Sequence, residues 1–160
     1  MTWLVIIFAI AMVLSPLMWF KQSPRQKRIS QLRSAAANLN LQISLHQRPE
    51  ARESEDALST VCYKIRCGQE PSHSDWVLHR FSQRGWTSDW EGWQWFNKQA
   101  DGSWCDLVED IVKDMPDGVS AIIMQSNSVG MIWDERGDEE QLGQIAKKLV
   151  QLKQHAENKC

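Results

Sequence analysis

The sequence lacks the motifs that most often reveal an enzyme or a metal site. It contains no Gly-x-Gly-x-x-Gly, Gly-x-x-x-x-Gly-Lys-Ser/Thr, Gly-x-Ser-x-Gly or His-Glu-x-x-His, so phosphate-binding loops, a nucleophile elbow and a zinc-protease helix are not indicated. Cys-x-x-Cys is also absent, and the four cysteines and four histidines are dispersed without zinc-finger spacing. The sequence therefore predicts reduced thiols, no cofactor, no metal and a protein that is not an enzyme.

Charge is missing from the start of the chain. No charged side chain occurs from Trp3 to Phe20, and the first acidic residue is Glu50. A helix over this run would extend roughly 27 Å, close to the roughly 30 Å of a bilayer core. The run ends in the bulky Leu17-Met-Trp-Phe20, where a signal peptidase requires small residues. The sequence therefore predicts a retained transmembrane anchor over residues 1–22, in preference to a cleaved signal peptide or a buried globular helix.

Positive charge follows the apolar run. Residues 21–49 contain six basic side chains and no acidic one: Lys21, Arg25, Lys27, Arg28, Arg33 and Arg48. The positive-inside rule then predicts a single-pass protein of the bacterial inner membrane, with its N-terminus outside and its C-terminal domain in the cytoplasm. Lys21, Arg25, Lys27, Arg28 and Arg33 are expected to contact anionic lipid headgroups. The rest of the chain is acidic, which disfavours nucleic acid as a partner.

Below the anchor, hydrophobic periodicity predicts an α+β fold. Ser23 and Pro24 are typical of a helix start, and residues 23–40 are expected to form a basic juxtamembrane helix. Residues 41–160 are expected to form the cytoplasmic α+β domain. Its strands are predicted at 41–45, 60–67, 76–81, 90–98, 119–124 and 129–133, and its helices at 104–115, with Ser103 as the cap, and at 138–157. Hairpin-like spacing favours a small, mainly antiparallel sheet packed with helices on one face.

Two segments of this domain allow more specific expectations. In the first strand, Leu41, Ile43 and Leu45 alternate with polar residues and are expected to face inward. In the last helix, apolar residues alternate at spacings of three and four: Leu142, Ile145, Leu149, Leu152 and Ala156. This spacing predicts packing onto the sheet in preference to a short coiled-coil seam.

Tryptophan is unusually concentrated in one part of the domain. Six of the nine tryptophans fall within 29 residues: Trp76, Trp86, Trp90, Trp93, Trp95 and Trp104. Such rings can fill the core of a small domain or form an exposed aromatic platform. Trp93 and Trp95 would share one face of a strand, with Phe96 on the other. We expect Trp90, Trp93 and Trp95 to contribute a partner-binding surface, while a purely structural role stays open.

Two groups of residues are the best candidates for catalysis, and both are weak. Asp106, Glu109, Asp110 and Asp114 lie on one predicted helix, where carboxylates can bind metal or act as an acid/base pair, but a solvated helix face is expected. Cys105 at the start of that helix has no partnering base nearby in the sequence.

The N-terminal 40 residues carry a resemblance to a known family. An uncharged N-terminus, one apolar span and Ser23-Pro-Arg-Gln-Lys-Arg28 before a basic helix resemble bacterial single-span YajC-type translocase accessory subunits. The layout is also similar to uncharacterised gammaproteobacterial inner-membrane proteins. The likeness ends beyond residue 41, where the Gly-Gly-Ile pattern of that family is missing. The resemblance implies an inner-membrane location and an accessory, non-enzymatic role.

Three hypotheses for function follow from the sequence. The first is a non-catalytic membrane-anchored accessory or assembly protein whose cytoplasmic domain binds a protein partner. The second is a sensor or small-ligand-binding module with a tryptophan-lined pocket. The third is an enzyme that uses Cys105 or the acidic helix.

Overall fold

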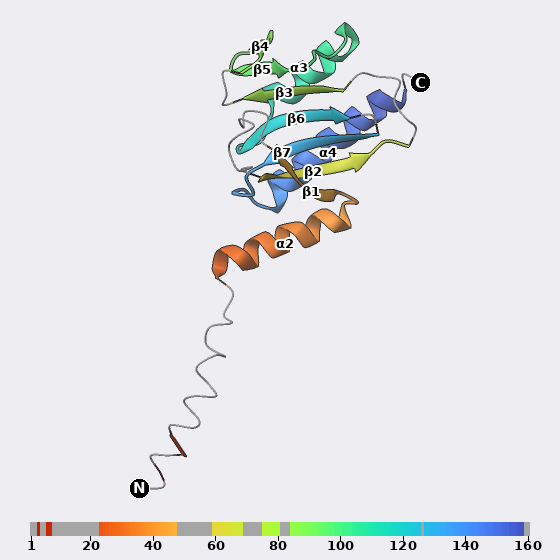
Figure 1. The fold of residues 1–160 in the computed structure, drawn as a ribbon. Helices are drawn as coiled ribbons and strands as arrows, with labels where there is room; N and C mark the ends of the chain where they lie inside the picture. Colours follow the sequence, from red (N-terminus) through yellow and green to blue (C-terminus); the bar gives the residue numbers. More distant parts are fainter. Residues whose placement is uncertain are drawn as a thin grey trace. The chain divides into compact units, whose positions relative to one another are not determined.

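The structure, a computed structural model, describes residues 3, 6–7, 23–47, 59–68, 75–80, 84–125 and 127–158 (Figure 1). The chain divides into two compact units, Met1–Gln31 and Leu32–Cys160. Apart from Trp3, Ile6 and Ile7, the expected anchor at 1–22 lies outside the described residues, as does Lys21. Within the described part of the chain, no helix combines the length and the apolar character needed to cross a bilayer.

The second unit is built on an antiparallel sheet of seven strands in the order β1-β2-β7-β6-β3-β5-β4. The strands are β1 (Gln42–Gln47), β2 (Ser59–Arg66), β3 (Trp76–Arg80), β4 (Trp86–Thr87), β5 (Trp93–Phe96), β6 (Val119–Gln125) and β7 (Ser128–Trp133). Every pairing is antiparallel. The predicted α+β class with an antiparallel sheet is therefore confirmed, and β4 is a short strand that the sequence did not predict.

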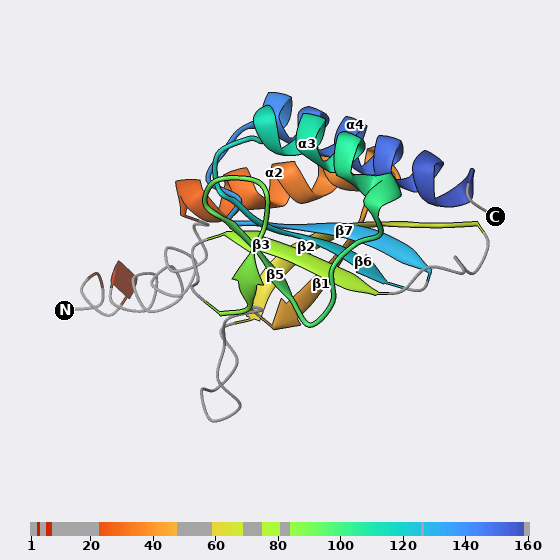
Figure 2. The same ribbon diagram turned by 90° about the horizontal axis from the view of Figure 1, so that it is seen from above.

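Helices cover one face of this sheet. Figure 2 shows α3 (Cys105–Lys113) and α4 (Glu139–Glu157) above the strands, together with α2 (Pro24–Asn38), which belongs to the second unit from Leu32 onward. The main core lies between the helices and the sheet, with Tyr63, Trp95, Trp133 and Leu149 among its fully buried side chains. A smaller cluster lies on the other face and contains Cys62, Ala121, Ile123 and Ile132, with Val77 packed against it.

The helix α4 follows its sequence pattern closely. The carboxylate of Asp138 caps the helix by accepting a hydrogen bond from the backbone N–H of Gln141 at 3.0 Å. The side chains spaced by three and four residues are all buried: Leu142, Ile145, Leu149, Leu152 and Ala156. The predicted packing of this helix onto the domain is confirmed.

The helix α2 begins as predicted and then joins the core. Ser23 Oγ accepts from Gln26 N–H at 3.3 Å, and Gln26 Oε1 accepts from Ser23 N–H at 3.1 Å, which is a reciprocal capping box. Leu32 and Ala36 are buried in the same core as the sheet residues. The division expected after residue 40 therefore falls inside α2, because its last two turns contribute apolar surface to the domain.

The start of α3 differs from the prediction. Ser103 lies within a 3₁₀ turn, Gly102–Trp104, and the residue that precedes α3 is Trp104. No side-chain capping bond is made at either start. The ring of Trp104 is buried, so packing of this indole fixes the helix start in place of a serine cap.

Candidate partner-binding edge

The structure places two of the three candidate tryptophans in the core. Trp93 is 5% exposed and Trp95 is 2% exposed, while Trp90 is half-buried against them. The expected exposed pair of Trp93 and Trp95 is therefore not found, although the two rings do share one face of β5 as predicted. This face of β5 points toward the helices, where the large apolar rings are removed from water.

The buried rings form one continuous aromatic cluster. The Trp95 ring lies 5.7 Å from Trp76 and 5.8 Å from Trp90, and Trp76 lies 5.5 Å from Trp104, all in edge-to-face arrangements. Trp104 in turn contacts the ring of His155 on α4 at 4.6 Å. The cluster joins the sheet to α4, so its geometry is that of a core.

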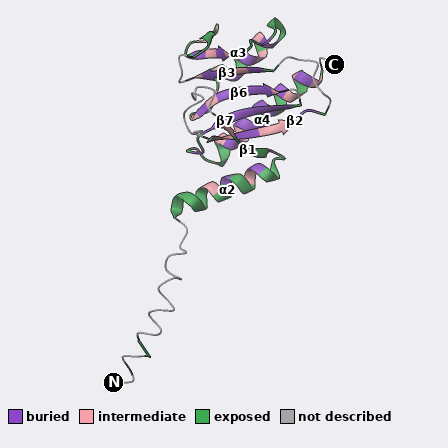
Figure 3. Cartoon of the chain, in the orientation of Figure 1, coloured by how far each residue is buried: buried purple, intermediate pink, exposed green. Residues whose placement is uncertain are grey.

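The exposed apolar surface of the second unit lies elsewhere. Among its described residues the large hydrophobic side chains that stay exposed are Leu39, Ile43, Leu45, Trp86 and Val150. Three of these five, Leu39, Ile43 and Leu45, occur within seven residues at the end of α2 and along β1. We call this group the β1 edge surface (Figure 3).

The register explains why the β1 edge surface is exposed. Ile43 lies opposite Tyr63 and Leu45 opposite Val61, so both point to the helix-covered face, as the alternation predicted. Leu41 is buried, but Ile43 is 37% exposed and Leu45 is 71% exposed. The predicted inward face is confirmed, but Ile43 and Leu45 stay exposed on it because β1 is the outermost strand of the described sheet.

The two edges of the sheet differ in how they are protected. The strand β4 is only two residues long, and short edge strands offer little backbone for pairing. The strand β1 has six residues, pairs with β2 without a bulge, and contains no charged residue or proline. Within β1 itself, the charges, prolines and bulges that usually prevent edge pairing are therefore absent.

A buried ion network holds α2 beside this edge. Glu135, which follows β7, accepts hydrogen bonds from Arg33 Nε at 2.9 Å, from Arg33 Nη2 at 2.8 Å and from the Tyr63 hydroxyl at 2.8 Å. The Glu135 side chain is 6% exposed and that of Arg33 is 45% exposed. The hydrogen bond from Arg33 to Glu135 raises the pKa of the Arg33 guanidinium. The network therefore connects α2, β2 and the segment after β7. It lies next to Ile43, because Tyr63 is the register partner of Ile43 on the neighbouring strand.

Two buried groups of β2, the Cys62 thiol and the Tyr63 hydroxyl, make the free energy of unfolding depend on pH in the alkaline range. Burial raises the pKa of Cys62 from 9.0 to about 12, and burial followed by the hydrogen bond to Glu135 raises the pKa of Tyr63 above its ordinary 10.0. Both groups hold their protons more tightly in the native state than in the unfolded state. Their contribution is complete below pH 9 and is lost as pH rises toward the native values.

We therefore expect the free energy of unfolding to fall above pH 9, by up to about 1.4 kcal/mol per pH unit for each titrating group. Urea unfolding at a series of pH values, followed by tryptophan fluorescence, measures this slope. The variant Cys62→Ala should have a shallower slope between pH 9 and 10, because in the unfolded chain Cys62 is at least half ionised there while Tyr63 is at most half ionised. An unchanged slope in this variant would contradict the assignment to Cys62.

The remaining candidate residues are placed as follows. Arg25, Lys27 and Arg28 are exposed on α2, whereas Arg33 is engaged by Glu135. Cys105 is half-buried, Asp106 and Asp110 are exposed on α3, Glu109 is half-buried there, and the exposed Asp114 follows the helix and pairs with Lys148 at 3.4 Å. Across the described ranges, no three His, Cys, Asp or Glu side chains come together as a set that could hold a metal ion.

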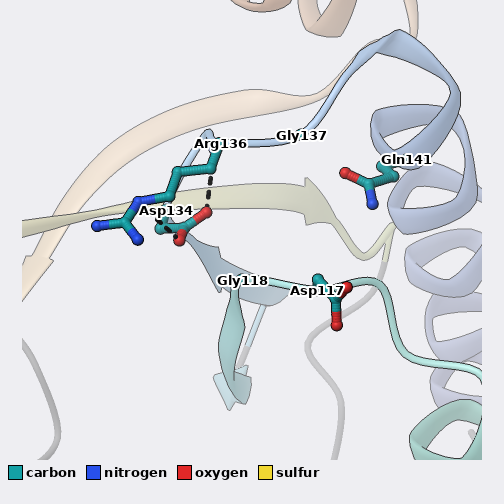
Figure 4. A pocket seen from close by; sticks show the side chains of 6 residues that line it. All are labelled: Asp117, Gly118, Asp134, Arg136, Gly137 and Gln141. Atoms are coloured by element: carbon teal, nitrogen blue, oxygen red, sulfur yellow. Dashed lines mark hydrogen bonds and ion pairs between the residues drawn. The ribbon is translucent and has the colours of Figure 1, made fainter.

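A polar cavity of about 330 Å³ lies where β6 begins and β7 ends (Figure 4). Its lining residues are Asp117, Gly118, Asp134, Arg136, Gly137 and Gln141. The Asp134 carboxylate already accepts from the Arg136 N–H at 3.0 Å and pairs with Arg136 Nε at 3.4 Å. No tryptophan is among these lining residues, so the cavity does not support the hypothesis of a tryptophan-lined ligand pocket.

Comparison with protein-family models, with curated proteins and with solved structures finds no match to this chain. The role of the β1 edge surface is therefore inferred from its own geometry. Sequence reasoning missed it because alternation identifies the face of a strand but not its neighbours. The only signal in the sequence is the lack of charge in Leu41–Gln47.

Proposed function

We propose that this chain is a non-catalytic, single-pass accessory or assembly protein of the bacterial inner membrane, and that its cytoplasmic α+β domain binds a protein partner. The uncharged N-terminal run and the basic residues after it support the location. The observation that carries the binding role is the outermost described strand, β1, with Ile43 and Leu45 exposed on it and Leu39 exposed shortly before it.

The energetic argument favours occupation of this edge. An apolar side chain such as leucine gains about 1.5–3 kcal/mol when it is fully removed from water. A long, flat, apolar edge strand left open is a site of aggregation, and proteins avoid that outcome by covering it. A partner protein at the membrane would cover β1 and use the same exposed area for affinity.

The test removes apolar area at the edge without disturbing the strand. The double substitution Ile43→Thr with Leu45→Thr places β-branched residues, which suit a strand, at both positions while it removes apolar area. We expect recovery of the crosslinked partner from membranes to fall at least about tenfold, because roughly 1.4 kcal/mol or more of contact is lost. Quantitative mass spectrometry of the crosslinked full chain measures the recovery.

The control is Val150→Thr, a matched change at an exposed apolar residue of α4. This control should leave recovery unchanged. Equal recovery with the edge variant and the unsubstituted chain would contradict the proposed surface. Activity of an alkaline phosphatase fused after Cys160, seen in the periplasm, would contradict the proposed location.

A further inference from the structure

The outer side of β1 offers a row of backbone groups for pairing. The strand is terminal in the described sheet, and in an antiparallel pair the N–H and C=O of alternate residues point away from the neighbouring strand. An edge of this kind can accept an extended peptide as an additional strand. Building on the function proposed above, we infer that the partner binds β1 through an extended segment that adds as an eighth strand and carries alternating apolar residues and acidic residues.

The apolar part of this segment follows from the register. Ile43 and Leu45 are two residues apart and lie on the same face. Residues of an added strand that lie opposite them also share one face and are separated by two positions. The partner segment therefore needs apolar side chains at positions i and i+2, which cover the exposed parts of Ile43 and Leu45.

The acidic part follows from the charge on the other face. Arg66 is exposed there and donates from Nε to Gln42 Oε1 on β1 at 3.2 Å, so its guanidinium is held toward the edge. Lys64 lies on the same face, opposite Gln42 in the register, but its Nζ donates to Gln125 Oε1 on β6 at 3.3 Å, so its ammonium is directed away from β1. The described residues beside this edge, 32–47 and 59–68, contain no acidic residue. Arg66 therefore places a positive charge at the polar face of the edge, and it favours carboxylates on the same face of an added strand.

Charge also argues against the nearest competitor, a second copy of this chain. Pairing of two β1 edges would bring the Arg66 side chains of the two domains toward each other, and like charges in this arrangement repel. The chain's own residues 48–58 carry Glu50, Glu53, Glu55 and Asp56 and are the other competitor. A crosslinking experiment separates these occupants.

The experiment uses the full chain in its membrane. The photoreactive residue p-benzoylphenylalanine replaces Leu45 in one variant and Val150 in a reference variant, and the crosslinked peptides are mapped by mass spectrometry after irradiation. We expect crosslinks from the Leu45 position, and not from the Val150 position, to one segment of another protein with apolar residues at i and i+2 and a net negative charge. A synthetic peptide of that segment should bind the purified chain, and Arg66→Glu should weaken this binding by about fivefold at low salt and less at high salt.

Each contrary result has a distinct meaning. Crosslinks that map to a second copy of the chain, or to residues 48–58, would overturn the inference. A partner segment without acidic residues, or one whose binding is unchanged by Arg66→Glu, would also overturn it while the proposed function stands. If no protein is crosslinked at the Leu45 position and the unsubstituted chain recovers no partner from membranes, the proposed function fails with it.

Discussion

The substitution Trp95→Ala is expected to lower the free energy of unfolding by about 3–5 kcal/mol. The Trp95 ring is 2% exposed and contacts both Trp76 and Trp90, so its removal leaves a cavity between β5, β3 and the helices. The lost burial and the cavity act in the same direction, because the surrounding rings cannot collapse fully into the space. Urea unfolding of the full chain, followed by circular dichroism, measures the change.

The control for this prediction is Trp86→Ala. Trp86 is the register partner of Trp95 on β4, but its side chain is 44% exposed. Trp86→Ala should therefore lower the free energy of unfolding much less than Trp95→Ala, by about 1 kcal/mol. If Trp95→Ala unfolds at the same urea concentration as the unsubstituted chain yet loses its partner, then the tryptophans form a binding platform and the structural assignment is wrong.

The substitution Glu135→Ala is expected to lower the free energy of unfolding by about 2–3 kcal/mol. It removes three hydrogen bonds and leaves the buried Tyr63 hydroxyl without its acceptor. The effect is smaller than for a fully buried ion pair, because the half-exposed Arg33 can be solvated by water. Glu135 has a φ of +58°, but alanine also carries a Cβ, so the backbone strain is the same in both chains.

Two further variants refine this prediction. Glu135→Gln keeps the shape and an acceptor for Tyr63, so it should cost less than Glu135→Ala. Glu109→Ala removes an exposed pair with Lys113 on α3 and should change the free energy of unfolding by no more than about 0.5 kcal/mol. Equal effects of Glu135→Ala and Glu109→Ala would show that the buried network does not stabilise the fold.

The network also bears on the β1 edge. Tyr63 supports Ile43 from the neighbouring strand, and Arg33 holds the end of α2 from which Leu39 projects. Loss of Glu135 would therefore loosen the scaffold that presents the β1 edge surface. Weaker partner recovery in Glu135→Gln than in the unsubstituted chain is consistent with this role, and Val150→Thr serves as the same reference as before.

Patterns that repeat along the sequence predicted the elements well. The 3-4 spacing from Leu142 to Ala156 identified both α4 and its buried face, and Ser23 with Pro24 identified the start of α2. The apolar segments at 119–124 and 129–133, separated by the polar residues 126–128, identified the β6–β7 hairpin. These features depend on local backbone geometry, so nearby residues contain the information.

Other features depend on residues that are distant in the chain. No pattern in the sequence indicated the Arg33–Glu135 pair, whose members are separated by 102 positions. Sequence reasoning also proposed Trp93 and Trp95 as a binding surface while a core role stayed open, because the pattern of a strand identifies a face but not which layer lies against it.

By itself, the sequence determined the α+β class, the antiparallel hairpins and the charge division between a basic N-terminal part and an acidic domain. Only the tertiary structure decided that the tryptophans are core and that β1 is the open edge. The physical reason is that helix and strand formation follow the local period of apolar side chains, whereas exposure depends on the order in which strands pair. That order brings β7 between β2 and β6, leaves β1 outermost, and so exposes Ile43 and Leu45 even though they point to the covered face.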